Sequence, residues 1–192
     1  ASAERTAQGF HRVKAFNRLD GRTKAKDTKS LKELIELLDW QALGSIESFG
    51  PRHIRMLLNG HTHSGVPVDS GLFDRLQEQS MLRIHLFQAQ EVSHFMWALA
   101  TLRARPSKAL LRTIFERAEL VVDDFNPQGI ANFSWACAKL RATPPDALFT
   151  RLCLRAEAIV GDFIPQTIAN FLWSCAKIGM CPHESALRAL CG

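Results

Sequence analysis

Few residues of this 192-residue chain have the types and the spacing that metal binding or catalysis needs. His61 and His63 form an H-x-H pair inside a glycine-rich segment, and two imidazoles could supply half of a metal site. Neither a carboxylate nor a cysteine pair stands at ligand spacing from them, so we interpret the pair as part of a solvated loop. Asp123 and Asp124 precede the start of a predicted helix, where the helix dipole stabilises acids, and we assign them no catalytic role.

The cysteines and the known catalytic motifs also give no sign of an enzyme. The chain has five cysteines, an odd number, and no two of them are spaced C-x-x-C, which disfavours a disulfide framework and a zinc site. Neither the phosphate-binding pattern G-x-x-x-x-G-K-[ST] nor the nucleophile pattern G-x-S-x-G occurs. We therefore predict a protein that is not an enzyme and that holds no metal or cofactor. The cysteines are predicted to be small buried apolar residues of a protein in a reducing compartment.

The net positive charge of the chain is concentrated in its first thirty residues. Residues 1–30 contain eight Lys/Arg and three Asp/Glu, a net charge of +5, whereas the remaining residues contain sixteen of each. Such a segment resembles an organelle-targeting sequence or a basic arm that is retained in the mature protein, and we favour the arm. A basic arm would contact the phosphates of nucleic acid without sequence preference. The candidate contact residues are Arg12, Lys14, Arg18, Arg22, Lys24 and Lys26.

An internal repeat of 38 residues defines the elements that would position any binding residue. Trp97, Trp135 and Trp173 are each separated by 38 residues, and the phenylalanines, glutamines and prolines around them keep the same step. The corresponding blocks are FQAQEVSHFMWALATLRARP, FNPQGIANFSWACAKLRATP and FIPQTIANFLWSCAKIGMCP. So many coincident residues in one register identify a repeat protein, in which each unit buries its apolar faces against its neighbours.

Each unit is predicted to contain two helices, which makes the fold all-α, an α-solenoid of antiparallel helix pairs. The second helix begins near Pro127 and Pro165, where the first-turn amide has no helical partner, and it ends before Pro144 and Pro182. Apolar residues at helical spacing place the first helices at about 70–86, 107–124 and 145–162. The predicted parts are a basic N-terminal arm (1–30), a divergent first repeat and loop (31–68), repeats at 69–106, 107–144 and 145–182, and a partial repeat or C-terminal cap (183–192).

The array is expected to continue weakly on both sides of these units. Residues 31–43 would form the first helix of the divergent unit, and its second helix is expected to break at Asn59-Gly60. The stretch 59–71 is then predicted to be a loop, which is long for a helix–helix connection. Residues 183–190 are similar to the first helix of a further unit.

The blocks FNPQGIANFSWACAKL and FIPQTIANFLWSCAKIG resemble the octotricopeptide repeat, a 38-residue helix pair with a signature close to PQ-x-x-A-N-x-x-W-A-x-A-K-L. The resemblance covers about residues 69–182. The first of these units departs from the signature, with Ala89 in place of proline, His94 in place of asparagine and Thr101 in place of lysine. The resemblance implies an RNA-binding protein of an organelle that acts in RNA maturation, stability or translation, or a structural subunit of an organellar ribosome.

Comparison of the units within the chain separates predicted packing positions from predicted binding positions. Trp97, Trp135 and Trp173 are identical and are therefore assigned to the core between repeats, with base stacking as the alternative. Lys139 and Lys177 could hold phosphates, but we favour a role in offsetting the helix dipole. Polar positions of the first helix change from unit to unit, as expected of side chains that read RNA, although a solvated outer face is the alternative. The candidate RNA-binding residues of the first helices are Arg75, Arg112, Thr113, Arg117, Thr150, Arg151 and Arg155.

From these observations we predict a non-catalytic RNA-binding helical-repeat protein of an organellar ribonucleoprotein, with a role in RNA processing, translation or the mitochondrial ribosome. The alternative is a scaffold subunit of a large organellar complex that does not read RNA. The predicted partners are organellar RNA, ribosomal RNA included, and other protein subunits of the assembly. The mitochondrion is favoured over the chloroplast. Membrane insertion is not expected, because the sequence has no apolar run of about eighteen residues.

Overall fold

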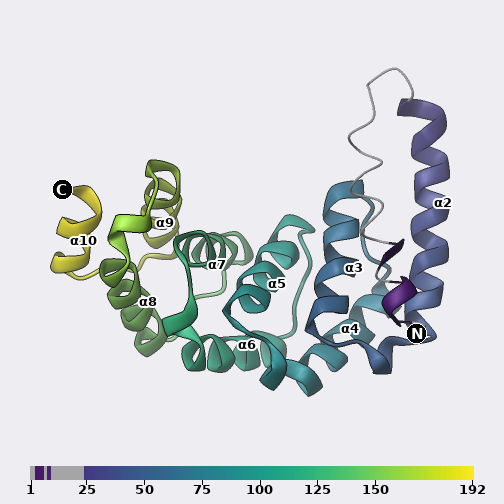
Figure 1. Cartoon of the computed structure of the whole chain (residues 1–192), viewed down its shortest axis with the longest axis horizontal. Coiled ribbons are helices and arrows are strands. Elements are labelled where there is room, and N and C mark those ends of the chain that lie inside the picture. Colours follow the sequence, from purple (N-terminus) through teal and green to yellow (C-terminus); the bar gives the residue numbers. More distant parts are fainter. Residues whose placement is uncertain (1–2, 7, 10–23) are drawn as a thin grey trace. The chain divides into compact units, whose positions relative to one another are not determined.

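The computed structural model describes residues 3–6, 8–9 and 24–192, with side chains in the last range from Leu31 onward. All regular secondary structure in these residues is helical (Figure 1), which confirms the prediction of an all-α fold of the α-solenoid type. The chain forms two compact units, Ala1–Leu86 and Phe87–Gly192, and the division falls inside the predicted repeat 69–106. Within the described ranges, no helix is long and apolar enough to cross a membrane.

The first unit is a group of helices in which α4 packs against α2, α3 and a short 3-10 turn. Asp69 begins α4, since its side chain accepts hydrogen bonds from the backbone N–H groups of Gly71 at 2.8 Å and Leu72 at 3.1 Å. Leu72 and Leu76 then bury one face of that helix. The elements are α2 (Lys24–Leu43), η1 (Ile46–Ser48), α3 (Pro51–Ser64), α4 (Ser70–Arg83) and η2 (Ile84–Leu86).

The loop predicted at 59–71 is wrong except at residues 65–69, because residues 59–64 belong to α3 and α4 begins at Ser70. Helix α3 continues through Asn59-Gly60 and ends at Ser64. Gly65 closes it in the left-handed conformation, with φ of 71° and a hydrogen bond from its N–H to the carbonyl of His61. The helix tolerates the Asn-Gly pair because Ile54, Leu57 and Leu58 bury its apolar face, and this burial outweighs the low helix propensity of the two residues.

His61 therefore lies in the core of the first unit and not in a solvated loop, contrary to the prediction. Its side chain is fully buried, with Nε2 2.9 Å from Oδ1 of Asp39 and Nδ1 3.0 Å from the carbonyl oxygen of Val66. These contacts link α2, α3 and the segment before α4. His61 is thus a structural residue of this unit.

The second unit consists of two layers of helices (Figure 1). Helices α5, α7 and α9, the second helices of consecutive repeats, pack side by side in one layer, and the first helices α6, α8 and α10 form the other. The elements are α5 (Ala89–Thr101), α6 (Lys108–Leu120), η3 (Val122–Asp124), α7 (Pro127–Leu140), α8 (Asp146–Ala158), η4 (Val160–Asp162), α9 (Pro165–Ile178) and α10 (Glu184–Cys191). Helices α7 and α9 begin at the expected prolines, and each predicted first helix is an α-helix followed by a 3-10 turn.

The core of the second unit is built from side chains that recur at the repeat period. Phe125 packs edge-to-face on Phe133 of α7, with ring centroids 5.8 Å apart, and Phe87 packs in the same way on Phe95 of α5 at 5.7 Å. Ile130 also lies at the buried face of α7. Because both faces of a middle helix are apolar, each repeat needs a neighbour on either side, which is the physical basis of a solenoid.

The cysteines only partly match their predicted burial. Cys137, Cys153 and Cys175 are buried as predicted, whereas Cys181 and Cys191 are exposed. Burial raises the pKa of the Cys153 and Cys175 thiols to about 12, and it raises the pKa of the Cys137 thiol well above its ordinary value. The three buried thiols are therefore unreactive packing residues.

Candidate nucleic-acid interface

Two members of the predicted RNA-binding set, Arg117 and Arg155, occupy the same position in consecutive repeats. Each donates a hydrogen bond to a backbone carbonyl thirty residues earlier in the chain. Nε of Arg117 donates to the carbonyl oxygen of Phe87 at 2.7 Å, and Nε of Arg155 donates to that of Phe125 at 3.0 Å. Each phenylalanine lies just before the second helix of the preceding repeat. Each of the two arginines thus connects the first helix of its repeat to the turn between the two helices of the preceding repeat.

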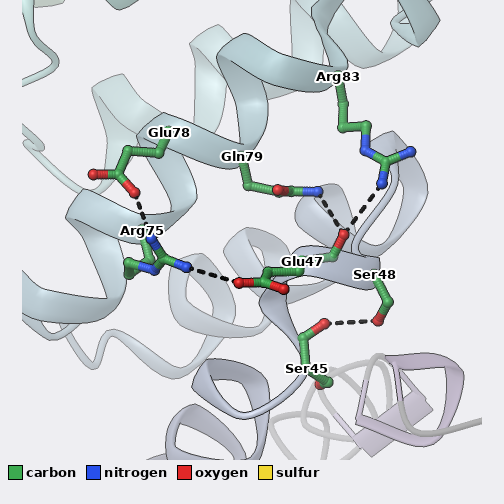
Figure 2. Close-up of polar contacts among 7 residues, drawn as sticks. All are labelled: Ser45, Glu47, Ser48, Arg75, Glu78, Gln79 and Arg83. Carbon is green, nitrogen blue, oxygen red and sulfur yellow. Dashed lines mark hydrogen bonds and ion pairs between the residues drawn. The ribbon is translucent and has the colours of Figure 1, made fainter.

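The first unit contains the same connection with a different side chain. Gln79, 38 residues before Arg117, donates through Nε2 to the carbonyl oxygens of Phe49 and Glu47, both at 3.0 Å. Figure 2 shows Gln79 and Arg83 converging on the backbone oxygen of Glu47. A glutamine and two arginines therefore perform one packing function at equivalent places.

The neighbouring position, Arg75, Thr113 and Arg151, is also occupied by contacts within the protein. Nη1 of Arg151 donates to the carbonyl oxygen of Glu119 at 2.7 Å, and Nη2 lies 2.9 Å from Oδ2 of Asp123. In the first unit Arg75 pairs with the carboxylates of Glu78 and Glu47 (Figure 2). The hydroxyl of Thr113 donates to the carbonyl of Ala109 in its own helix.

The remaining members of the predicted set are exposed. The side chain of Arg112 is 78% exposed and lies 3.9 Å from the carboxylate of Glu116 one turn later, and Thr150 is also exposed. Of the seven first-helix candidates, Arg75, Arg117, Arg151 and Arg155 contact the preceding repeat, Thr113 bonds within its own helix, and Arg112 and Thr150 face solvent. Contact of any of them with RNA stays a prediction.

The candidates of the basic arm lie outside the residues whose side chains are described. The backbone of Lys24 and Lys26 forms the start of α2, so the helix begins earlier than the predicted residue 31. The other four arm candidates lie wholly outside the described residues; they are Arg12, Lys14, Arg18 and Arg22.

The prediction that the three repeated tryptophans are core residues is wrong for Trp173 and only partly met by Trp97 and Trp135. Trp97 and Trp135 are half-buried, and Trp173 is 44% exposed. Nζ of Lys139 lies 5.4 Å from the ring centroid of Trp135 and 5.7 Å from that of Trp173, so one ammonium group contacts two indole rings of neighbouring repeats. The layer formed by α5, α7 and α9 consequently presents aromatic rings at its surface with a cation between two of them.

Helices α5, α7 and α9 end with the same backbone hydrogen bonds, in which an N–H beyond the helix reaches back to the last turn. The residue between the helix and this N–H adopts the left-handed conformation. It is Gly179 after α9, with φ of 76°, but Arg103 after α5 and Arg141 after α7, with φ of 53° and 54°. Gly65 of the first unit occupies the same repeat position. Because a non-glycine residue in this conformation costs about 1–2 kcal/mol, the two arginines are unexpected at their places.

Arg103 and Arg141 line a surface pocket of about 660 Å³ at the C-terminal ends of α5 and α7. Lys139, Arg105 and Trp135 also line it, and none of its lining residues in the described chain is Asp or Glu. Five other Lys/Arg side chains of the described residues form ion pairs with carboxylates. None of the ion pairs among the described residues involves the four cations of this pocket. We call Arg103, Arg105, Lys139, Arg141, Trp135 and Trp173 the basic aromatic surface.

The sequence prediction had not assigned the three arginines of this surface. One signal in the sequence could have identified two of them, because positions 65, 103, 141 and 179 follow the 38-residue period and contain Gly, Arg, Arg and Gly. Glycine at both ends of that series indicates a left-handed helix end, and arginine in the middle departs from it. Within the described residues, no group of three or more His, Cys, Asp or Glu side chains could hold a metal ion.

A model of the RNA-editing substrate-binding complex 6 protein family matches residues 29–180. The matched stretch contains the complete basic aromatic surface and all of the hydrogen bonds between repeats described above. A search of curated proteins found no match. The family match supports an RNA-associated helical protein, as the sequence predicted, without showing membership of the octotricopeptide repeats in particular.

Proposed function

Because this chain belongs to the RNA-editing substrate-binding complex 6 protein family, we propose that it is a non-catalytic, RNA-associated component of an organellar RNA-editing complex. The observation that carries this proposal is the family match over residues 29–180. The proposed compartment is the mitochondrion. The family gives no support to a chloroplast protein or to a ribosomal subunit, which the resemblance to octotricopeptide repeats also implies.

The surface of the second unit supports an association with RNA on physical grounds. RNA carries one negative charge per phosphate, and a site for it needs cations that are not already neutralised by carboxylates. The basic aromatic surface supplies such cations together with indole rings, on which unpaired bases stack. In the same unit Arg151 and Arg155 are engaged with the protein itself, so they offer less to a ligand.

A second role as a scaffold for other protein subunits is favoured by exposed leucines on the first helices. Leu120 at the end of α6 is 75% exposed, and Leu154 of α8 is exposed as well. Large apolar side chains are typical of contacts between proteins where several of them form one exposed patch, and this second role assigns the two leucines to such a patch. This role is compatible with RNA association, since a component of an editing complex can contact both.

The proposal is tested by titrating the purified chain into labelled single-stranded RNA at about 50 mM and about 200 mM salt. We expect saturable binding that weakens at the higher salt concentration. A folded chain that shows no binding even at the lower salt concentration would refute the RNA association. The scaffold role is tested separately by purifying the native complex and treating it with ribonuclease, because subunits held by protein contacts should remain bound.

A further inference from the structure

We propose that the basic aromatic surface binds single-stranded RNA, with Arg103, Arg105 and Arg141 on the phosphates and Trp135 and Trp173 stacking on unpaired bases. This inference rests on the proposed function, since it assigns the RNA contact of the protein to one surface. It differs from the sequence-based prediction, which assigned the contact to the first helices.

The first argument is the distribution of charge in the second unit. Residues 87–192 contain eleven Lys/Arg and nine Asp/Glu, so the unit as a whole is nearly neutral. Four of the eleven cations line the pocket at the ends of α5 and α7, whereas none of the nine acids does. A pocket whose charged lining residues are all cations concentrates positive potential and attracts a polyanion, although the unit as a whole has little net charge.

The second argument is the presence of arginine at a place that the fold would fill with glycine. The backbone hydrogen bonds that end α5, α7 and α9 are the same, so the fold requires only the left-handed conformation at Arg103 and Arg141. Gly179 meets that requirement without steric cost. The hydrogen bonds described for this protein assign neither guanidinium group a role in its packing, so a ligand outside the fold accounts best for both.

An offset of the helix dipole explains only part of this cluster. Cations near a helix C-terminus interact favourably with its carbonyl groups, and this applies to Lys139 in the last turn of α7. Arg105, however, lies four residues beyond the end of α5 at Thr101, and the dipole effect falls off within about one turn. The dipole also gives no reason for the exposed indole ring of Trp173 and the partly exposed ring of Trp135 beside the cations.

The third argument identifies the ligand as single-stranded RNA. Lys139 contacts the rings of Trp135 and Trp173 and also lines the pocket, so the aromatic rings and the arginines form one continuous surface. In a duplex the base faces are stacked on one another, whereas in a single strand they are free to stack on indole. An acidic protein segment would match the charges, but its Asp and Glu side chains have no aromatic face to stack on the indole rings.

The experiment compares the parent chain with Arg103→Gly/Arg141→Gly, in which glycine takes the left-handed places that it already occupies at Gly65 and Gly179. This variant removes two cations without disturbing the helix ends, so its melting temperature should not fall. We expect its affinity for single-stranded RNA to drop roughly tenfold or more. The slope of log affinity against log salt should become shallower by about 1.4, if each arginine neutralises one phosphate at about 0.7 per contact.

Two further variants make the result specific. The double variant Lys32→Ala/Arg188→Ala removes the same charge from exposed intrahelical ion pairs outside this surface, and it should bind RNA like the parent. Trp173→Ala should lower the affinity about tenfold or more while leaving the salt slope unchanged, because it removes stacking and not a phosphate contact.

Each outcome decides between defined alternatives. Loss of affinity in the glycine variant but not in the Lys32/Arg188 control supports the proposal. Parent-like RNA binding by both Arg103→Gly/Arg141→Gly and Trp173→Ala overturns the assignment of this surface, and the proposed RNA association still stands. A parent chain that binds no RNA overturns both. A third outcome would also overturn the proposal: polyglutamate displaces the RNA at equal charge concentration, and Trp173→Ala binds RNA with the affinity of the parent. That result would show that the surface binds acidic protein.

Discussion

Replacing Arg155 with alanine should lower the free energy of unfolding by about 1.5–3 kcal/mol. Nε of Arg155 donates to the carbonyl oxygen of Phe125 at 3.0 Å, and the Phe125 residue is only 1% exposed. A hydrogen bond with a charged donor contributes about 1.5–3 kcal/mol, and its loss leaves a poorly hydrated carbonyl without this donor. The same interaction recurs at Arg117, so Arg117→Ala should have a similar effect.

The first unit provides the matched control for this prediction. Gln79 occupies the equivalent position and donates to the equivalent carbonyl of Phe49 at 3.0 Å. Arg155→Gln should therefore recover more than half of the stability that Arg155→Ala loses. Arg112→Ala, at an exposed position of the same predicted set, should stay within about 0.5 kcal/mol of the parent.

The measurement is urea and thermal unfolding followed by far-ultraviolet circular dichroism. For a protein of this size, each kcal/mol shifts the melting temperature by about 2–4 °C, so Arg155→Ala should melt roughly 3–12 °C below the parent. A melting temperature equal to that of the parent would refute the packing role. If Arg155→Ala melted like the parent and lost affinity for RNA, Arg155 would be a residue that contacts RNA, as the sequence pattern had indicated.

Three further predictions concern packing, thiol reactivity and the basic arm. Trp173→Ala should cost about 1–2 kcal/mol in urea unfolding because only about half of the side chain is buried, whereas Phe133→Ala should cost about 3–5 kcal/mol; equal costs would contradict this assignment. In the native protein iodoacetamide should modify Cys181 and Cys191 alone, and modification of all five thiols before unfolding, seen by mass spectrometry, would disprove the burial. Changing the four Lys/Arg between residues 12 and 22 to glutamine should weaken binding of any RNA and flatten its salt dependence by about 0.7 per lost phosphate contact; an unchanged slope would exclude the arm from the interface.

The positions of the helices in the second unit could be predicted from the sequence because their determinants are local. Helices α7 and α9 begin at Pro127 and Pro165, since proline is favourable in a first helical turn and unfavourable later. The 38-residue period then transfers these boundaries from one unit to the next. Local signals were misleading at Asn59-Gly60, where tertiary burial of α3 outweighs the weak helix propensity of the pair.

The roles of individual side chains were less predictable, because identity between repeats does not show which face is covered. The regular spacing of Trp97, Trp135 and Trp173 indicated a common role, but Trp97 and Trp135 are partly buried whereas Trp173 is exposed, so the interpretation as core was wrong for Trp173. One repeat position holds Gln79 in the first unit and Arg117 in the second, and such variation between repeats indicated contact with a ligand. Both side chains nevertheless donate to a backbone carbonyl thirty residues earlier in the chain. Two different side chains can make one bond of this kind, so variation alone does not identify a binding position.

The repeat, its helix pairs and an association with RNA could be inferred from patterns along the chain, although the resemblance pointed to octotricopeptide repeats and the family match is to the RNA-editing substrate-binding complex 6 protein. The tertiary structure was needed to distinguish cations that are engaged with the protein from cations that are available to a ligand. Arg155 and Arg141 have the same chemistry, but the first donates to the carbonyl of Phe125 and the second lines an acid-free pocket. This is because the availability of a charged group depends on the neighbours that other repeats place beside it, and no local stretch of sequence contains those contacts.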